Sequence, residues 1–454
     1  MKVNQHERIY NAASLGKSKM AILGLQHLFA MFGATILVPI LVNNYFHGEG
    51  LSVQVTLFFA GIGTLLFHVL SKFKVPAFLG SSFAFLGGFS TVAELDSGKF
   101  ADMSYGEKLP YACGGIVIAG LLYLVLALII RAVGVNKVMR YLPPVVTGPI
   151  IICIGLGLAP SAVSNAATCW PLALIALAVV IIFNIWGKGM FKIIPILLAV
   201  IIAYIAAVIM NACGVTAADG TPLLNFQPIA DAKVVGLPDF FVAKFDLTAI
   251  LVMAPIAIAS MMEHVGDISA ISATTKRDFI SDPGLHRTLL GDGLATALAG
   301  LFGGPANTTY GENTGVLELS KVYDPNVIRL AACYAIVLSF IPKISQIIGT
   351  MPAAIIGGIS FILYGMISAI GIRNIVENKV DFTNSRNLII AAAILVCGLG
   401  LGGGVTFTIG SVTITLTALA IASIVGIVFN AILPGKDYEF GTNKTGDENR
   451  GVHI

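Results

Sequence analysis

This sequence has few charged residues. Only 11% of its 454 residues are Asp, Glu, Lys or Arg, whereas a soluble domain has about 25%. The hydrophobic share is 56% and the mean hydropathy is +0.89. Apolar runs of about 20 residues, the length that a helix needs to cross a bilayer, recur from end to end and leave no room for a large soluble domain. These features exclude a soluble protein and indicate an integral membrane protein.

Other absences narrow the function further. The sequence has no basic block with interleaved aromatics, which excludes a nucleic-acid surface. It shows no nucleophile or metal constellation of an intramembrane enzyme, so we expect neither an enzyme nor a cofactor. Residues 1–19 show no signal-peptide cleavage pattern, so the first apolar segment is expected to remain as a span. No C-x-x-C pair occurs, and neither a zinc site nor a disulfide framework is indicated among the cysteines, which are Cys113, Cys153, Cys169, Cys213, Cys333 and Cys397.

The apolar runs predict an all-α polytopic protein with fourteen membrane segments. The third and tenth segments are short and contain Gly, Pro and Ser or Thr. The thirteenth boundary is hard to place, because 398–415 is glycine-rich and then alternates between apolar and hydroxyl residues. The predicted segments are 19–43, 52–71, 76–95, 110–132, 142–160, 169–187, 192–212, 247–271, 287–303, 305–320, 325–348, 351–371, 386–402 and 413–434.

The distribution of basic residues supports this count. If the N-terminus is cytoplasmic, 22 of the 27 Lys and Arg residues fall on the cytoplasmic side. A missed or extra span would invert this bias downstream of the error. We therefore expect an even number of spans with both termini in the cytoplasm. The five basic residues left outside are Lys99, Lys108, Lys233, Lys244 and Lys343.

The chain resembles itself at three places, which predicts two inverted repeats of seven spans. Residues 76–83 align with 305–312, the run 142–148 aligns with 351–357, and Gln26-His27 matches Glu263-His264. An odd number of spans in each repeat turns the second copy upside down in the membrane. This is the plan of many secondary transporters, whose sites lie where broken helices of the two repeats meet.

The third and tenth segments are the candidate broken helices. A Gly/Pro break inside a bilayer frees backbone N–H and C=O groups that lipid cannot satisfy, so they must face protein or a wet cavity. Phe83 and Glu312 occupy equivalent positions at the two breaks. Freed N–H groups and helix N-termini there can bind carbonyl oxygens or anions. Ordinary helix kinking is the alternative.

Two glutamates lie where the membrane is expected. Glu263 follows the uncharged run 247–262, and Glu312 lies in the polar break P-A-N-T-T-Y-G-E-N. A charge at mid-bilayer costs about 2.5–3.5 kcal/mol on the insertion scale, so such groups indicate a functional site. Asp267 lies one turn after Glu263, and repulsion between the two carboxylates favours a bound proton that can be loaded and released. A structural ion pair and a metal site at His264 and Asp267 are the alternatives, although the metal site lacks a third ligand.

Other polar residues in the spans are candidates for supporting roles. Asp292 is expected either to hydrogen-bond to the broken segments or near Asp267, or to be a satisfied helix-start residue. Gln26 and His27 lie in the first span, where Gln26 could bond across helices or belong to the site. His68 is expected at the membrane interface.

On these residues the chain resembles the nucleobase–ascorbate transporters, the nucleobase:cation symporter-2 family, over nearly its whole length. The family signature is present at 312–321 as E-N-T-G-V-L-E-L-S-K, with Ser320 in place of the usual Thr. The bacterial uracil:proton symporters of this family have the most similar runs. These runs are Q-H-L-F-A-M-F-G-A-T at 26–35, G-S-S-F-A-F at 80–85, E-H-V-G at 263–266, D-P-G-L-H-R at 282–287 and N-T-T-Y-G-E-N at 307–313.

The resemblance implies a core domain and a gate domain, with short antiparallel strands of spans 3 and 10 crossing at the substrate. The core is expected at 19–135 and 244–349 and the gate at 136–243 and 350–434, between a cytoplasmic N-terminus (1–18) and tail (435–454). Glu263 and Glu312 would accept hydrogen bonds from uracil N–H groups, and Glu263 with Asp267 would handle the proton. The backbone N–H groups of Phe83 and Gly311 would bind the uracil carbonyls, Ala34 and Tyr310 would line the pocket, and Ser82, Asn313, Gln26, His27 and Asp292 would support it.

The resemblance implies uracil:H⁺ symport across the bacterial inner membrane by elevator-type alternating access. The partners implied are uracil or a related nucleobase, lipid, and a second copy of the chain bound through the gate domain. One residue leaves the substrate open, because the similar uracil carriers have His where this chain has Asp267, and many purine carriers have an acidic residue there. A xanthine or guanine symporter is therefore the main alternative, and a nucleobase facilitator or channel is a weaker one.

Overall fold

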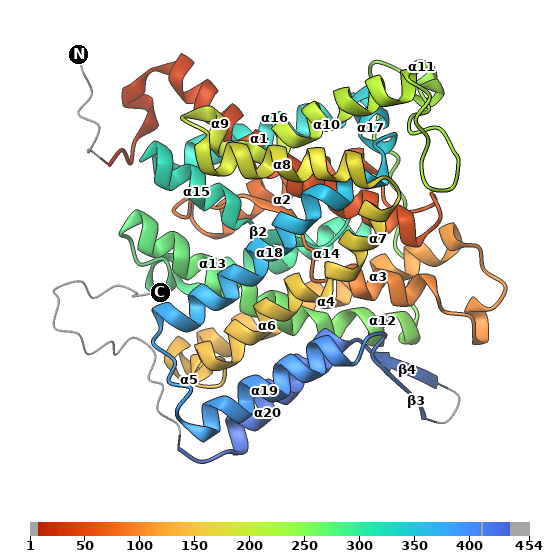
Figure 1. Ribbon diagram of the computed structural model, residues 1–454. Helices are drawn as coiled ribbons and strands as arrows, with labels where there is room; N and C mark the ends of the chain where they lie inside the picture. The colour runs from red at the N-terminus through yellow and green to blue at the C-terminus, as the bar shows by residue number, and fades with distance from the viewer. Residues whose placement is uncertain (1–7, 410–411, 436–454) are drawn as a thin grey trace.

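The computed structural model describes residues 8–409 and 412–435, and the fold is predominantly helical (Figure 1). The predicted N-terminal residues before 8 and the predicted tail from 436 onwards lie outside the described residues. The longer elements of the first half are α1 (Lys17–Tyr45), α2 (Val53–Leu70), β1 (Leu79–Ser81), α3 (Leu86–Ala93), α4 (Tyr105–Val133), α6 (Pro144–Gly157), α7 (Ala159–Ala167), α8 (Trp170–Trp186) and α10 (Pro195–Ala212).

The second half repeats this order of elements. It contains α12 (Leu247–Met253), the 3-10 turn η3 (Ala254–Ile256), α13 (Ala257–Thr275), α14 (Leu285–Leu301), β2 (Asn307–Thr309), α15 (Gly311–Ser320), α16 (Pro325–Ser339), α17 (Pro342–Gly349), α18 (Ala353–Glu377), α19 (Ser385–Gly400), β3 (Val405–Ile409), β4 (Val412–Leu416) and α20 (Ala418–Ile432). The remaining short turns and helices are η1 (Ala12–Leu15), η2 (Gly98–Phe100), α5 (Val135–Met139), α9 (Met190–Ile193), α11 (Gln227–Asp231) and the π-turn η4 (Ile280–Gly284).

Among the described residues, seven helices are long and apolar enough to cross a membrane, or eight if the bent pair α16–α17 is one span. If the bent pair counts as one span, three shorter apolar helices, α8, α19 and α20, add to the eight long ones. The helix α14 and the two broken segments then complete the fourteen predicted spans. The chain is therefore a multi-pass membrane protein with the predicted all-α architecture and short strands in segments 3 and 10.

The helix contacts follow a two-fold pattern in which every main contact of one half has a counterpart. The contact of α4 with α14 corresponds to that of α16 with α2, and the contact of α8 with α10 corresponds to that of α19 with α20. Exchanging the two halves leaves two contacts unchanged, that of α2 with α14 and that of α6 with α18. This is the pattern that two inverted seven-span repeats give, because exchanging the halves leaves the set of contacts unchanged.

The contacts also divide the helices into two groups. The core group consists of α1, α2, α4, α12 to α16, and both broken segments, and the gate group consists of α6, α7, α8, α10, α18, α19 and α20. The densest packing in the core joins α4 to α14. There, a Cβ on Gly293 would lie 2.4 Å from Tyr123 Cβ, and one on Gly120 would lie 2.5 Å from the Gly293 carbonyl oxygen. Glycine is thus needed on both helices for this approach.

The two broken segments form a two-stranded antiparallel ladder inside the core group. The Cα partners are Leu79 with Thr309, Gly80 with Thr308, and Ser81 with Asn307. The repeat alignment makes Leu79 equivalent to Thr308 and Gly80 to Thr309, so the repeat axis passes between the first two of these pairs. Each break therefore satisfies part of the backbone of the other, as a membrane interior requires.

Two predicted segments differ in shape from straight helical spans. The segment 325–348 is not one straight span, because α16 and α17 are bent by 84° at the break before Pro342. The segment 413–434 does not begin as a helix, since β3 and β4 pair as an antiparallel hairpin and α20 begins at Ala418. The alternating V-T-F-T and V-T-I-T runs favour strands because β-branched and aromatic residues fit an extended, pleated chain. Hydropathy alone does not distinguish such runs from a helix.

Candidate functional site

The site begins at the ends of the two strands, where α3 and α15 start. The Tyr310 N–H donates to the Phe78 carbonyl at 2.9 Å, and the Ser82 N–H donates to the Ala306 carbonyl at 2.8 Å. After these bonds the ladder ends, and no described residue accepts a hydrogen bond from the N–H of Phe83 or Gly311. Gly311 is the first residue of α15, so its N–H lies at the positive end of that helix. These two N–H groups are available to a ligand oxygen.

Three carboxylates gather near these N–H groups. Glu263 and Asp267 lie one turn apart on α13, and Glu312 is the second residue of α15. Asp267 is 7% exposed, the other two are half-buried, and the three are close enough to interact electrostatically. Asp267 Oδ1 lies 3.7 Å from where a Cβ on Gly311 would be. The structure thus places residues from spans 8 and 10 together, as the sequence predicted.

Tyr310 and Ala34 are both buried beside the ladder. The Tyr310 hydroxyl donates to the Ser81 carbonyl at 2.9 Å, and the Ser81 hydroxyl donates to the Thr35 carbonyl at 2.8 Å. Thr35 follows Ala34 on α1, so these bonds connect α1, β1 and the start of α15. A rigid support of this kind fixes a binding constellation more precisely than a loop does.

The predicted supporting residues occupy different positions. Asn313 and His27 are buried together, with the Asn313 side-chain amide donating to the His27 carbonyl at 3.0 Å. The Ser82 hydroxyl is buried and has no hydrogen-bond partner among the described residues. Gln26 is half-buried on α1, and its side-chain amide has no hydrogen bond to the described part of the chain.

Asp292 is not a helix-start residue, so that interpretation is wrong. It lies in the interior of α14 and is fully buried, with its Oδ2 3.1 Å from His264 Nδ1. The same nitrogen lies 2.9 Å from Thr309 Oγ1 in β2. The chain positions of Asp292 and His264 gave no sign of this pairing. It depends on the close approach of α13 and α14 beside the strands.

The gate helices cover the site with mainly apolar groups that sequence reasoning did not identify. The Phe83 ring packs edge-on against Tyr364 of α18, with ring centroids 6.1 Å apart. Ile370 of α18 lies 3.6 Å from where a Cβ on Gly311 would be, and Ile151 of α6 lies 3.7 Å from the corresponding point on Gly266. All the predicted polar ligands therefore belong to the core group, and the gate group contributes mainly apolar side chains to the other side of the site.

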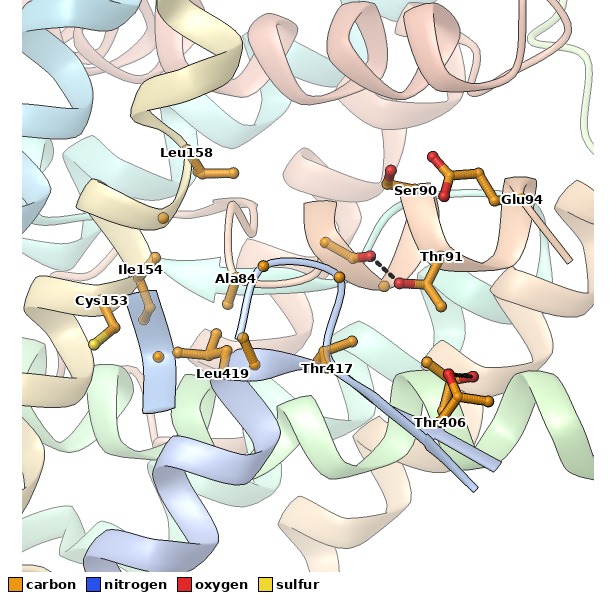
Figure 2. A pocket seen from close by; sticks show the side chains of 18 of the residues that line it. Ala84, Ser90, Thr91, Glu94, Cys153, Ile154, Leu158, Thr406, Thr417 and Leu419 are labelled. Carbon is orange, nitrogen blue, oxygen red and sulfur yellow. Dashed lines mark hydrogen bonds between the residues drawn. The ribbon is translucent and has the colours of Figure 1, made fainter. Parts of the chain in front are cut away.

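A cavity of about 490 Å³ reaches this site from one side, between α3 and the gate group. Figure 2 looks into it, with Ser90, Thr91 and Glu94 on the α3 side and Thr406 and Thr417 at the hairpin. Phe83 also lines the cavity, whereas Glu263 and Glu312 do not. The cavity thus meets the site at Phe83 only.

The polar groups of the described site include both hydrogen-bond acceptors and donors. In the described ranges, 8–409 and 412–435, no group of three or more His, Cys, Asp or Glu side chains is placed to hold a metal. Carboxylate acceptors and unbonded N–H donors lie in the same region, with Asp267 Oδ1 3.7 Å from where a Cβ on Gly311 would be. Such a set complements a molecule that offers both N–H and C=O groups.

Comparison with known proteins identifies the relatives of this chain. The model of the Permease family (Xan_ur_permease) matches residues 18–407. The chain is 39% identical to a protein named Uracil permease from Bacillus caldolyticus, over 95% of each chain, and 41% identical to the Uracil permease of Bacillus subtilis (strain 168), over 90% of this chain and 91% of the relative. It is 36% identical to the Uracil permease of Escherichia coli (strain K12), over 90% of each chain.

Solved structures show the same fold at low sequence identity. The transmembrane domain of the cyanobacterial bicarbonate transporter BicA gives a TM-score of 0.59 at 16% identity, covering 84% of this chain and 96% of that chain. Murine Slc26a9, an anion transporter in the inward-facing state, gives a TM-score of 0.60 at 10% identity and covers 91% of this chain and 67% of that chain.

Proposed function

Because this chain belongs to the Permease family of membrane transporters, we propose that it takes up uracil together with a proton. The observation that carries the proposal is the meeting of two acidic residues and two unbonded N–H groups at the ends of one strand ladder. Uracil offers two ring N–H donors and two carbonyl acceptors. Glu263 and Glu312 would accept from its N–H groups, and the N–H groups of Phe83 and Gly311 would donate to its carbonyls.

Proton coupling would follow from the position of Asp267 and Glu263. An ionised Asp267 beside Gly311 would repel a substrate carbonyl bound there, and two ionised carboxylates one turn apart repel each other. Uracil would therefore bind when this pair holds a proton. Loss of that proton to the cytoplasm would weaken binding and release the substrate, and no other coupling ion or cofactor is needed.

The division of residues between the two groups supports an elevator-type movement. Every proposed ligand belongs to the core group, so the core can move against the gate wall without dismantling the site. We propose that the core domain is 19–135 and 244–349 and the gate domain is 136–243 and 350–434. The distribution of Lys and Arg supports a bacterial inner-membrane orientation with both termini in the cytoplasm. Pairing of two copies through the gate domain is part of the same proposal.

Uracil uptake by the Glu263→Gln variant tests the coupling. The amide keeps the size of the side chain but cannot bind and release a proton. We expect accumulation of uracil driven by a pH gradient to be lost, while exchange of labelled for unlabelled uracil is retained in part. Accumulation by the variant that is equal to wild type and equally dependent on pH would contradict the role of Glu263.

A xanthine carrier is the second candidate, and Asp267 is the residue that favours it. Competition settles the choice: labelled uracil uptake by the wild-type protein is measured with unlabelled xanthine, guanine or uracil in excess. Displacement by uracil alone supports the uracil assignment. Stronger displacement by xanthine would favour a purine symporter. Uptake without accumulation against a gradient would favour a facilitator.

A further inference from the structure

One side chain of the gate group, Ile370 of α18, contacts the core group at a proposed substrate ligand. Its Cδ1 atom lies 3.6 Å from where a Cβ on Gly311 would be, which is an ordinary van der Waals distance. Gly311 is the first residue of α15 and carries one of the two unbonded N–H groups. Asp267 Oδ1 lies 3.7 Å from the same point. Ile370 is therefore an apolar neighbour of a position that is otherwise polar.

Ile370 keeps free surface here, unlike the other gate side chains that approach the site. It is 41% exposed, whereas Tyr364 and Ile151 are each only 2% exposed. Gly315 lies one turn further along α15 on the same side as Gly311, and a Cβ added to it would have no contact within 4 Å. The space beside Gly311 and Ile370 is thus partly open, and the size of the side chain at 370 decides how much of it a ligand can use.

Hydrogen bonding alone does not distinguish uracil from a purine such as xanthine at this site. In uracil, two N–H groups and two carbonyls alternate over four consecutive ring positions, N1, C2, N3 and C4. The six-membered ring of xanthine carries the same alternating set. Two carboxylates and two backbone N–H groups complement both molecules equally well. A site of this kind rejects the larger molecule only where a side chain blocks its added atoms.

The added atoms of xanthine lie on the one edge of the ring that uracil leaves apolar. Positions C5 and C6 of uracil carry only C–H groups, and the corresponding carbons of xanthine are fused to the five-membered ring. All the proposed polar ligands belong to the core group, so the C5–C6 edge would face the apolar side chains of the gate group. A five-membered ring on that edge would need the space beside Gly311 that Ile370 occupies.

We propose that Ile370 is the specificity-determining residue that limits the substrate to a single six-membered ring. The proposal rests on the proposed function, because the ligand is placed by Glu263, Glu312 and the two N–H groups. It divides recognition between the two groups of helices. The core group reads the hydrogen-bonding edge of the nucleobase, and the gate group measures its size. Asp267 then has a role in proton coupling and none in excluding purines.

The test measures displacement of labelled uracil from the purified full-length protein by unlabelled uracil or xanthine. We expect xanthine to bind wild type more weakly than uracil by about tenfold or more, because excluding even one added carbon from a tight apolar pocket has an effect of this size. The Ile370→Ala variant removes the block, so we expect it to bind xanthine about tenfold more tightly than wild type does, with little change for uracil. Ile372→Ala is the matched control, because Ile372 is 53% exposed and lies two residues further along the same helix, on a different face.

A larger side chain tests the same contact in the opposite direction and serves if Ile370→Ala does not fold. Ile370→Phe narrows the space at the C5–C6 edge. Uracil brominated at C5 is therefore expected to lose affinity for this variant by about tenfold relative to unsubstituted uracil. Equal affinities of the two ligands, in the same ratio as in wild type, would contradict the contact between Ile370 and this edge.

The outcomes separate this inference from the proposed function. If wild type binds neither uracil nor xanthine, the proposed function fails. If wild type binds both equally well, nucleobase transport stands and the inference is overturned. The inference is also overturned if Ile370→Ala has the same preference as wild type and Ile372→Ala, or loses both ligands equally. A change of preference in Asp267→His but not in Ile370→Ala would overturn it as well, because a polar ligand would then select the substrate.

Discussion

Gly80 shows how a single residue sets the geometry of the site. A Cβ at this position would lie 2.4 Å from the Tyr310 ring and 2.7 Å from Thr35 Oγ1. Real side chains do not tolerate such distances, so even alanine would push the Tyr310 hydroxyl away from Ser81. The G-S-S run thus serves packing as well as ligand binding. Its glycine is needed because the ring of the second repeat lies directly over the strand of the first.

The Glu312→Ala variant tests the proposed substrate ligand at the residue scale. If Glu312 accepts a hydrogen bond from uracil, its loss removes about 1.5–3 kcal/mol of binding energy, which raises the uracil Kd by about one to two orders of magnitude. Binding of labelled uracil to the purified protein measures this change. Glu318→Ala is the matched control, because Glu318 is an exposed carboxylate in the same helix. An unchanged Kd for Glu312→Ala would remove Glu312 from the site.

Histidines show where reasoning from single residues stops. The sequence context of His68 predicts a residue at the membrane interface, but it does not predict the contacts of the ring inside the protein. The ring is fully buried, with Nε2 2.9 Å from the Ala77 carbonyl just before β1. A polar ring in an apolar run looks the same whether it faces the interface or a broken helix. Only the fold of the neighbouring break provides the carbonyl that makes burial acceptable.

At the scale of elements, each broken segment is held by a threonine of a neighbouring helix. The Thr64 hydroxyl of α2 accepts from the Leu79 N–H at 2.9 Å and lies 2.7 Å from the Ala60 carbonyl of its own helix and 3.2 Å from the Leu79 carbonyl. The Thr296 hydroxyl of α14 accepts from the Asn307 N–H at 3.2 Å and donates to the Asn307 carbonyl at 2.9 Å. Each threonine thus satisfies the N–H of one strand residue, and the Thr296 hydroxyl also satisfies the carbonyl of the same residue.

The Thr296→Val variant tests this support. The change keeps the shape but leaves a buried N–H and C=O without their partner, which costs about 1–3 kcal/mol for an unsatisfied group. We expect a lower midpoint of thermal unfolding in detergent and weaker uracil binding. Thr288→Val on the same helix is the control, because its buried hydroxyl donates only to Leu285 of its own helix. Equal effects of the two variants would contradict the special role of Thr296.

The β3–β4 hairpin is the element that hydropathy predicted least well. Its alternating residues were assigned in part to the last span, whereas the structure pairs Val405 with Leu416 and places Thr406 Oγ1 3.0 Å from Thr415 Oγ1. The hairpin packs on α12 and its base lines the cavity that reaches Phe83. Period-two alternation was visible in the sequence and is the signal that could have identified these strands.

At the scale of the whole molecule, the contact between core and gate decides which movements are possible. Gly33 of α1 faces Ile196 of α10, where a Cβ on Gly33 would lie 3.0 Å from Ile196 Cβ. This close contact joins the two groups, and an elevator movement must break it. Packing across the remaining wall is apolar, with Ile151 and Ile370 facing glycines. Surfaces of this kind can slide because few directional bonds are lost.

A cross-link between the two groups tests the elevator movement. Cysteines are placed at Gly33 and Ile196 in a chain otherwise free of cysteine. Their Cβ atoms would lie 3.0 Å apart, so α1 and α10 must separate slightly to reach the spacing of about 3.5–4.5 Å that a disulfide needs. We expect oxidation to abolish uracil uptake and reduction to restore it. The matched control is a disulfide inside the gate group, between Gly398→Cys and Cys153, which is the one native cysteine retained in the control chain; the corresponding Cβ distance is 2.9 Å. Full uptake by the oxidised Gly33–Ile196 variant would exclude movement at this contact.

The sequence by itself determined the membrane class, the even span count, the two related halves and the two glutamates within the predicted membrane segments. These features depend on local apolarity, on charge and on the order of residues along the chain. Tertiary structure alone decided that Asp292 pairs with His264 and that Asp267 lies beside Gly311. Each of these contacts joins residues on different helices or strands. Their positions depend on how closely glycines allow the helices to pack, which no local pattern records.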